Sequence, residues 1–249
     1  MIESSGDRDL QSRARQSLGT SGEAIYRTVA NVLHERCVGG VLVDVGCGTG
    51  NLWRDVASQF VRCIGIDAVR YDGLPAGGEF EFVQADLDRE PLPLPDEAAD
   101  VVAAVETIEH LENPRGFCRE LARVVRPGGW VVITTPNQLS ALSLLTLATR
   151  HRFSAFQDSA YPAHRTALLE VDLRRIATEC GLRDLDVRFT GHGRVPLSAA
   201  HYPAAIARRF PRALSDNVVL IGRRGIARHA PADRHIPGGG CAHRQTPTS

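Results

Sequence analysis

Apolar segments alternate with amphipathic ones along residues 41–137. Five apolar runs predict β-strands: VLVDV 41–45, RCIGID 62–67, EFVQAD 81–86, AADVVAAV 98–105 and WVVITTPN 130–137. Between them, NLWRDVASQF 51–60 and NPRGFCRELARVVRPGG 113–129 predict helices, the second with Pro at its start and Gly-Gly at its end. Strands that alternate with helices form parallel βαβ units. The alternation therefore predicts an α/β fold with a doubly wound, Rossmann-like sheet and helices on both faces.

The pattern continues on both sides of this stretch. A helix is predicted over 22–36 and another over 167–181, followed by a sixth strand in 182–193 and a seventh over 217–224. Residues 138–166 contain no clear strand, which predicts an inserted helical lid after the fifth strand. We therefore expect a flexible leader over 1–20, one domain over 21–224 and a disordered tail over 225–249.

The composition excludes several classes of function. The chain has 249 residues with zero formal net charge, and all 29 of its basic residues are arginine. Schiff-base chemistry and phosphate-binding P-loops both need lysine, so neither is possible. The six cysteines form no CxxC pair, which argues against a zinc knuckle. Dispersed arginines without interleaved aromatic residues make nucleic-acid binding a weak expectation.

The polar first twenty residues lack the apolar core of a signal peptide. The longest apolar stretch, residues 139–148, is too short and too rich in serine to span a bilayer. We therefore expect a soluble, cytoplasmic protein with no membrane span.

A glycine-rich turn follows the first predicted strand. It reads Gly46-Cys47-Gly48-Thr49-Gly50, and Asp67 ends the second predicted strand. In an open parallel sheet, ligands bind at the carboxyl ends of the strands. Glycine allows the backbone to approach a ligand closely, and an acid at the end of the second strand can accept hydrogen bonds from a ribose diol. These features predict a cofactor that contains a nucleoside.

The glycine spacing narrows the choice of cofactor. Nicotinamide and flavin enzymes use G-x-G-x-x-G to hold a pyrophosphate, whereas this turn is G-x-G-x-G with Asp44 two positions ahead of it. An acid at this point favours a cationic ligand. S-adenosylmethionine combines adenosine with a sulfonium and an ammonium group, so it meets both conditions. A nicotinamide-binding oxidoreductase is a remote alternative, because the chain lacks both that spacing and a Tyr-Lys pair.

Five segments, taken together in their order and spacing, resemble the class I S-adenosylmethionine-dependent methyltransferases. They are DVGCGTG, GID, QADLD, ETIEHL and RVVRPGGWVVITTPN, and the resemblance covers roughly residues 22–224. It implies that Gly46, Cys47, Gly48 and Gly50 line the amino-acid end of the cofactor. It further implies that Asp67 binds the ribose, Ala68 lies beside the adenine, Asp86 binds the adenine amino group with Leu87 nearby, and Val105 and Glu106 lie near the methyl donor.

The stretch Glu106-Thr107-Ile108-Glu109-His110 bears on mechanism. In a helical turn, positions 106, 109 and 110 would share one face. Three interpretations remain open: structural or cofactor contacts, a general base at His110 assisted by Glu109, or a divalent cation held by Glu106, Glu109 and His110. The E-x-x-E-H pattern is similar to that of quinone-biosynthesis O-methyltransferases and of small-RNA 2′-O-methyltransferases. His164 could add a ligand, and Mg²⁺, Mn²⁺ and Zn²⁺ all suit such a set.

The acceptor is expected to contact the predicted lid. Its aromatic and basic residues could hold an aromatic or anionic small molecule: Phe153, Phe156, Tyr161, Arg150, Arg152 and Arg165. Because no basic track accompanies the motif, we expect O-methylation of a small-molecule hydroxyl in a biosynthetic pathway. N- or C-methylation, RNA 2′-O-methylation and a catalytically inactive cofactor-binding protein are the alternatives.

Overall fold

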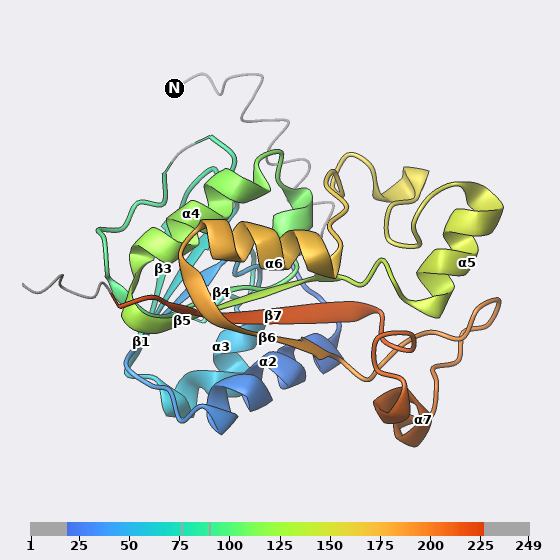
Figure 1. The fold of residues 1–249 in the computed structure, drawn as a ribbon. Coiled ribbons are helices and arrows are strands. Elements are labelled where there is room, and N and C mark those ends of the chain that lie inside the picture. Colours follow the sequence, from blue (N-terminus) through green and yellow to red (C-terminus); the bar gives the residue numbers. More distant parts are fainter. Residues whose placement is uncertain (1–18, 76, 90, 227–249) are drawn as a thin grey trace, which may run out of the picture.

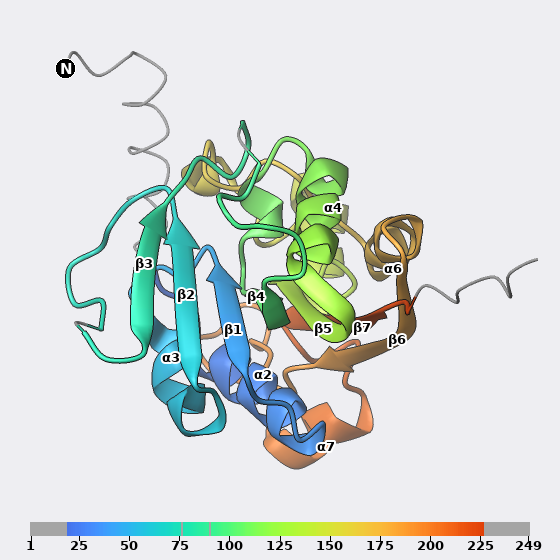
Figure 2. The ribbon, with the colours of Figure 1, turned by 90° about the vertical axis from the view of Figure 1, so that its left-hand side faces the viewer.

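The computed structural model describes residues 19–75, 77–89 and 91–226. Within these ranges the chain forms one seven-stranded sheet with strand order β3-β2-β1-β4-β5-β7-β6. The strands are β1 (Val41–Val45), β2 (Arg62–Asp67), β3 (Phe80–Gln84), β4 (Ala99–Ala104), β5 (Val125–Pro136), β6 (Leu182–Phe189) and β7 (Asn217–Arg224). Figure 2 shows β3, β2 and β1 side by side and pointing in the same direction. The predicted Rossmann-like sheet with seven strands is confirmed.

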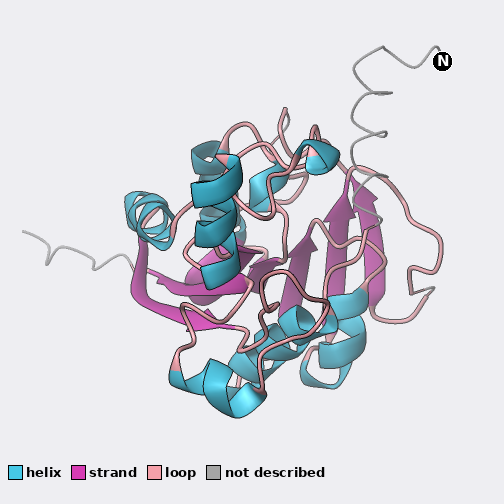
Figure 3. Ribbon diagram, turned by 90° about the vertical axis from the view of Figure 1, so that its right-hand side faces the viewer, coloured by secondary structure: helices cyan, strands magenta, loops and turns pink. Residues whose placement is uncertain are grey.

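Helices cover both faces of this sheet (Figure 3). They are α2 (Glu23–Glu35), α3 (Asn51–Val56), α4 (Pro114–Val124), α5 (Ala141–Arg150), α6 (Glu170–Glu179) and α7 (Ala204–Arg209), with short 3₁₀ turns η1 (Ala57–Gln59), η2 (Ile108–His110) and η3 (Asp158–Ala160). Helices α4 and α6 lie on one face, and α2 and α3 lie on the other (Figure 1). None of the helices in the described ranges is long and apolar enough to cross a membrane.

The two layers of the core follow the alternation of side chains along the central strands. In β1, Val43 and Val45 belong to a buried cluster that also contains residues of α4 and α6. Leu42, on the opposite face of the strand, belongs to a second cluster with residues of α2 and α3. Successive side chains of a strand point to opposite faces, so a continuous apolar run fills both layers. This explains why VLVDV is apolar at every position except Asp44.

The order of the strands reverses between β1 and β4, which both pair in parallel with their neighbours. This switch point places the loops after β1 and β4 next to each other at the carboxyl ends of the strands. Strand β7 is antiparallel to both β5 and β6, whereas the sequence pattern predicted parallel units throughout. The difference arises because β6 leads into its neighbour β7 without a helix crossing the sheet.

The stretch Arg126-Pro127-Gly128-Gly129 was predicted to end a helix over 113–129, and that prediction is wrong. Helix α4 ends at Val124, and the stretch lies inside β5. Val125 pairs with Ala99, and the next pairs shift register, which marks a bulge between them. Proline lacks a donor for the strand ladder and Gly128 has φ 78°, so these residues suit a bulge.

The connections that follow β5 and β6 extend beyond the carboxyl ends of the parallel strands (Figure 1). The first, residues 138–166, contains α5 and η3 and is helical as predicted, although its role as a lid stays a prediction. The second, residues 190–216, contains α7, which the sequence pattern did not predict. The predicted leader and tail lie outside the described residues except at 19–20 and 225–226.

Candidate active site

A cavity of about 610 Å³ opens at the carboxyl ends of the strands. Its walls come from the segment before α2, from the loops after β1, β2, β3, β4 and β5, and from the β6–β7 connection. Eight of the predicted cofactor residues line it: Gly46, Gly48, Asp67, Ala68, Asp86, Leu87, Val105 and Glu106. The predicted ligand site and the cavity therefore coincide.

The three glycines after β1 all have positive φ, at 77°, 51° and 76°. An added Cβ at Gly46 would meet the side chain of Thr107, one at Gly48 would meet the backbone oxygen of Gly19 at 2.1 Å, and one at Gly50 would meet Pro75. The glycines thus allow other segments of the protein, and not only a ligand, to approach the turn closely. Of the four predicted loop residues, Cys47 and Gly50 do not line the cavity.

Asp67 ends β2 and is held in place by backbone donors. The Gly48 N–H donates to its Oδ2 at 2.9 Å, and the Val69 N–H donates to its Oδ1 at 3.3 Å. Burial raises the pKa of Asp67, and these hydrogen bonds act against that rise. The side chain is 8% exposed and lines the cavity. A carboxylate fixed in this way can accept hydrogen bonds from a ribose diol.

The loop after β3 adds two more acids, Asp86 and Asp88, to the cavity. Asp86 accepts a hydrogen bond from the Asp88 N–H at 3.0 Å, and Asp88 in turn accepts one from the Glu112 N–H at 2.7 Å. Asp88 lines the cavity beside Asp86 and Leu87, although the sequence analysis did not single it out. These contacts join the loop after β3 to the start of α4.

Asp44 does not line the cavity, although it was predicted to face the cofactor. It is buried in β1, and its Oδ1 has no hydrogen-bond partner among the described residues. Burial, and secondarily the charge of Asp67, raises the pKa of Asp44 to about 7. Asp44 would therefore influence a cationic ligand in the cavity only electrostatically, without direct contact.

The carboxyls of Glu106, which is half-buried, and Glu109, which is fully buried, have different hydrogen-bond partners. Glu106 has φ 49°, accepts a hydrogen bond from the Thr134 hydroxyl at 2.9 Å and accepts another from the Asn217 amide at 2.8 Å. Glu109 accepts one from the Thr135 hydroxyl at 3.1 Å, and its Oε1 has no partner among the described residues. Burial raises the pKa of Glu109 to about 8, and burial together with Glu109 raises the pKa of Glu106.

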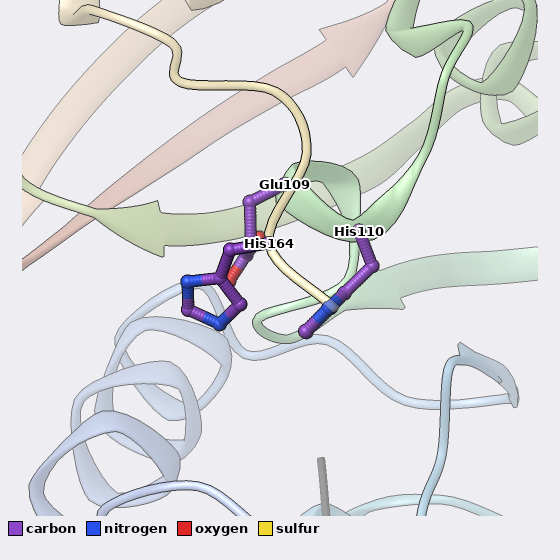
Figure 4. A group of neighbouring side chains, drawn as sticks. All are labelled: Glu109, His110 and His164. Atoms are coloured by element: carbon purple, nitrogen blue, oxygen red, sulfur yellow. The ribbon is translucent and has the colours of Figure 1, made fainter. Parts of the chain in front are cut away.

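Glu109, His110 and His164 come together on the cavity wall (Figure 4). One ligand atom from each lies within 4.8 Å of the others, and the two imidazole rings meet edge-on with centroids 4.8 Å apart. Glu106 is not part of this group because the turn η2 begins after it, at Ile108. The structure thus brings three of the four predicted metal ligands together.

Backbone carbonyls fix both imidazoles of this group. His110 Nδ1 lies 2.9 Å from the Ala163 oxygen, and His164 Nδ1 lies 2.7 Å from the Ala155 oxygen. A carbonyl oxygen only accepts, so each Nδ1 carries the proton and the lone pair of a neutral ring is on Nε2. Burial, and then the neighbouring His110, lowers the pKa of His164, which favours its neutral form.

None of the six residues predicted to hold the acceptor lines the cavity: Arg150, Arg152, Phe153, Phe156, Tyr161 and Arg165. Arg152 pairs with Asp158, and Tyr161 is 69% exposed. From residues 138–166 the cavity is lined by Ser154, Ala155, Ala163 and His164. Two groups of residues that do line the cavity were not predicted. One lies at the start of α2 and just before it, and the other runs from the end of β6 to the first residue of β7: Thr20, Ser21, Tyr26, His192, Arg194, His201, Asp216 and Asn217. The only sequence signal for the second group was the polar HGR and AHY runs in a long connection without periodicity.

Comparisons with known proteins identify the family of this chain. A family model described as a methyltransferase domain matches residues 43–133. A probable S-adenosylmethionine-dependent methyltransferase of Mycolicibacterium smegmatis is 31% identical over 204 residues, covering 78% of this chain and 71% of the relative. A ubiquinone biosynthesis O-methyltransferase of Burkholderia pseudomallei is 27% identical over 207 residues, covering 77% and 82%.

Solved structures share the fold. An S-adenosylmethionine-dependent methyltransferase from Mesorhizobium loti superposes with TM-score 0.60 at 17% identity, covering 82% of this chain and 99% of that protein. One from Archaeoglobus fulgidus gives TM-score 0.58 at 19% identity, covering 84% and 97%. The cavity, the glycine turn with Asp67 and these relatives agree, and the chain belongs to the class I S-adenosylmethionine-dependent methyltransferases.

Proposed function

We propose that this enzyme transfers the methyl group of S-adenosylmethionine to a hydroxyl oxygen of a small-molecule acceptor. The observation that carries the proposal is the group of Glu109, His110 and His164 on the wall of the same cavity as Asp67. Methyl transfer from a sulfonium needs mainly alignment and exclusion of water, because the donor is already activated. A hydroxyl acceptor additionally has to lose its proton. Glu109, His110 and His164 could accept that proton or hold a cation that makes the hydroxyl more acidic.

His110 suits the role of the proton acceptor. Its Nδ1 is bonded to the Ala163 carbonyl, which leaves Nε2 as the basic nitrogen of the ring. A neutral imidazole is an efficient general base. In this form of the mechanism, His110 would accept the hydroxyl proton, and bound S-adenosylmethionine would supply the methyl group to the oxygen, with S-adenosylhomocysteine, a neutral thioether, as the other product.

The same three residues also fit a divalent cation. Metal-bound histidines usually donate their other ring N–H to a carbonyl, as both of these do. The Oε1 of Glu109, which has no hydrogen-bond partner among the described residues, is a suitable third ligand atom. Two nitrogens and one carboxylate favour Zn²⁺ or Mn²⁺ over Mg²⁺, which prefers oxygen ligands. A bound cation would lower the pKa of the acceptor hydroxyl.

The relatives lend support to an oxygen acceptor. Several are named ubiquinone biosynthesis O-methyltransferases, including the one from Burkholderia pseudomallei. RNA is a poorer acceptor for this cavity, because its described lining holds six carboxyl side chains and a single arginine: Asp67, Asp86, Asp88, Glu106, Glu109, Asp216 and Arg194. One arginine is far fewer than the several basic side chains that neutralise a nucleic-acid backbone.

The atom that is methylated can be identified directly. The protein would be incubated with a bacterial metabolite extract and a donor whose methyl carbon is ¹³C, and the labelled products would be examined by carbon NMR. We expect a methyl signal in the chemical-shift range of methyl ethers or esters. A labelled methyl bonded only to nitrogen or carbon would contradict the proposal.

Removal of metal separates the two forms of the mechanism. Protein treated with EDTA and then freed of chelator would be assayed alone and with Mn²⁺, Zn²⁺ or Mg²⁺. Recovery by one ion, together with loss of binding of that ion in Glu109→Gln but not in the exposed control Glu179→Gln, supports the cation. Full activity after EDTA that falls in His110→Gln supports the base. Full activity in both tests would contradict any role for this group.

A further inference from the structure

A small hairpin in the β6–β7 connection forms part of the cavity wall. The Tyr202 N–H donates to the Gly193 oxygen at 3.0 Å, and the Val195 N–H donates to the Ala200 oxygen at 2.9 Å. Between these bonds, Arg194 forms an antiparallel bridge with His201. The hairpin thus places Arg194 and His201 side by side, and both line the cavity.

Asp216 anchors this hairpin to the sheet. Its N–H donates to the His192 oxygen at 3.0 Å, and its Oδ2 accepts from the Arg194 N–H at 3.2 Å and from Arg194 Nε at 3.0 Å. The next residue, Asn217, begins β7 and donates to Glu106 at the floor of the cavity. The Arg194 guanidinium is therefore held from its Nε side by an element that also contacts the floor.

The imidazoles of His192 and His201 stack beside this arginine. Their ring centroids are 3.9 Å apart with an interplanar angle of 28°. Two stacked imidazoles and a guanidinium repel one another whenever the rings are protonated, and Asp216 is the acid that faces them. Among the described residues that line the cavity, Arg194 is the only arginine, and its ion pair with Asp216 is made through Nε.

We propose that His192, Arg194 and His201 form a subsite for an anionic group of the methyl acceptor, either a carboxylate or a phosphate. A guanidinium whose Nε is already oriented presents its terminal N–H groups to such an anion, and the two imidazoles add donors. The inference rests on the proposed transfer to a small molecule and adds the chemical class of that molecule.

The position of the subsite favours the acceptor over the cofactor. Most residues proposed for the cofactor follow β1, β2 and β3, and Val105 and Glu106 follow β4, whereas this hairpin lies in the connection from β6 to β7 at the other side of the strand order. S-adenosylmethionine also carries a carboxylate, so the two sources have to be distinguished by experiment. We assign the subsite to the acceptor.

The test uses protein saturated with S-adenosylhomocysteine and three probes of similar shape: neutral 4-hydroxyphenethyl alcohol, 4-hydroxyphenylacetate and 4-hydroxyphenyl phosphate. Binding is followed through the ring-proton NMR signals of His192 and His201, which detect weak association. We expect at least one anionic probe to bind about tenfold more tightly than the alcohol, the gain from one charge-assisted contact. Arg194→Gln should abolish this preference, and Arg208→Gln on α7, whose side chain does not line the cavity, should keep it.

Whichever anion gains more identifies the group that the subsite prefers. Equal binding of the three probes, including no detectable binding of any, overturns the inference. Retention of the preference in Arg194→Gln overturns it too. Weaker binding of S-adenosylhomocysteine in Arg194→Gln would instead assign the arginine to the cofactor. None of these outcomes depends on which atom is methylated, so the inference can fail while the proposed O-methylation stands.

Discussion

Asp67 is the residue on which cofactor binding depends most in this account. Its two oxygens are oriented by the N–H groups of Gly48 and Val69, so the carboxylate is ready for a diol before the ligand arrives. A hydrogen bond to a charged group contributes about 1.5–3 kcal/mol. Asp67→Ala should therefore weaken binding of S-adenosylhomocysteine roughly 10- to 150-fold in calorimetry. Unchanged affinity in a folded variant would remove Asp67 from the cofactor site.

At the scale of residues, the sequence predicted which strand-end residues lie at the cavity better than it predicted which side chains meet there. Asp67, Asp86 and the glycines were predictable because they follow apolar strands, and strand ends meet at one edge of a parallel sheet. His164 was named only as an addition, and its meeting with His110 depends on a loop that returns across the cavity after η3. His192, Arg194 and His201 were missed because a hairpin in a connection without periodicity has no pattern that predicts it.

The turn after β1 and the segment before α2 act together as one element. The Thr49 N–H donates to the Gly19 oxygen at 2.9 Å, and the Asn51 amide donates to the Thr20 hydroxyl at 2.9 Å. Because Gly48 has no side chain, the backbone of Gly19 can lie directly against it. Segment 19–22 is thereby held at the cavity, where its residues form part of the wall.

Gly48→Ala tests this contact, with Gly73→Ala as the matched control. Both glycines have positive φ, at 51° and 83°, so alanine costs about 1–2 kcal/mol of backbone strain at either position. Only at Gly48 would the new Cβ also collide with backbone, since nothing lies within 4 Å at Gly73. We expect Gly48→Ala to weaken S-adenosylhomocysteine binding and to lower the free energy of unfolding by more than the control does. Equal effects of the two variants would show that the contact with Gly19 is unimportant.

At the scale of elements, regular periodicity was a reliable guide and irregular segments were not. The bounds of β1, β2 and β7 agree with the apolar runs that predicted them. The RPGG stretch was misassigned because Pro and Gly-Gly end helices and also suit bulges, and only the pairing of β5 with β4 distinguishes the two. The antiparallel direction of β7 likewise depends on tertiary pairing.

Over the whole molecule, the burial of two acids, Asp44 in β1 and Glu109 in η2, makes stability depend on pH. The pKa of Asp44 is raised to about 7 and that of Glu109 to about 8, both chiefly by burial. The unfolded chain releases these protons near pH 4, whereas the folded protein holds them until pH 7–8. Their contribution to stability is therefore complete below about pH 4 and is lost as the pH rises to about 8.

Asp44→Asn isolates one part of this dependence. Between pH 5 and pH 8 the Asp44 term should reduce the free energy of unfolding by on the order of 2 kcal/mol, and the variant should lack that loss. Urea unfolding of metal-free wild type and variant at several pH values measures the difference between their free energies of unfolding. The titration of the histidines contributes equally to both proteins and cancels in this difference. Parallel pH profiles for the two proteins would contradict a protonated Asp44 in the folded state.

The central claim is that one cavity holds both the methyl donor and the group that prepares the acceptor. The most direct test compares wild type with His110→Gln, measuring S-adenosylhomocysteine affinity by calorimetry and transfer of a labelled methyl group to acceptors in a metabolite extract. We expect unchanged affinity and transfer reduced about 10²- to 10⁴-fold, as for loss of a general base. Transfer at the wild-type rate by a variant that binds S-adenosylhomocysteine normally would contradict the account.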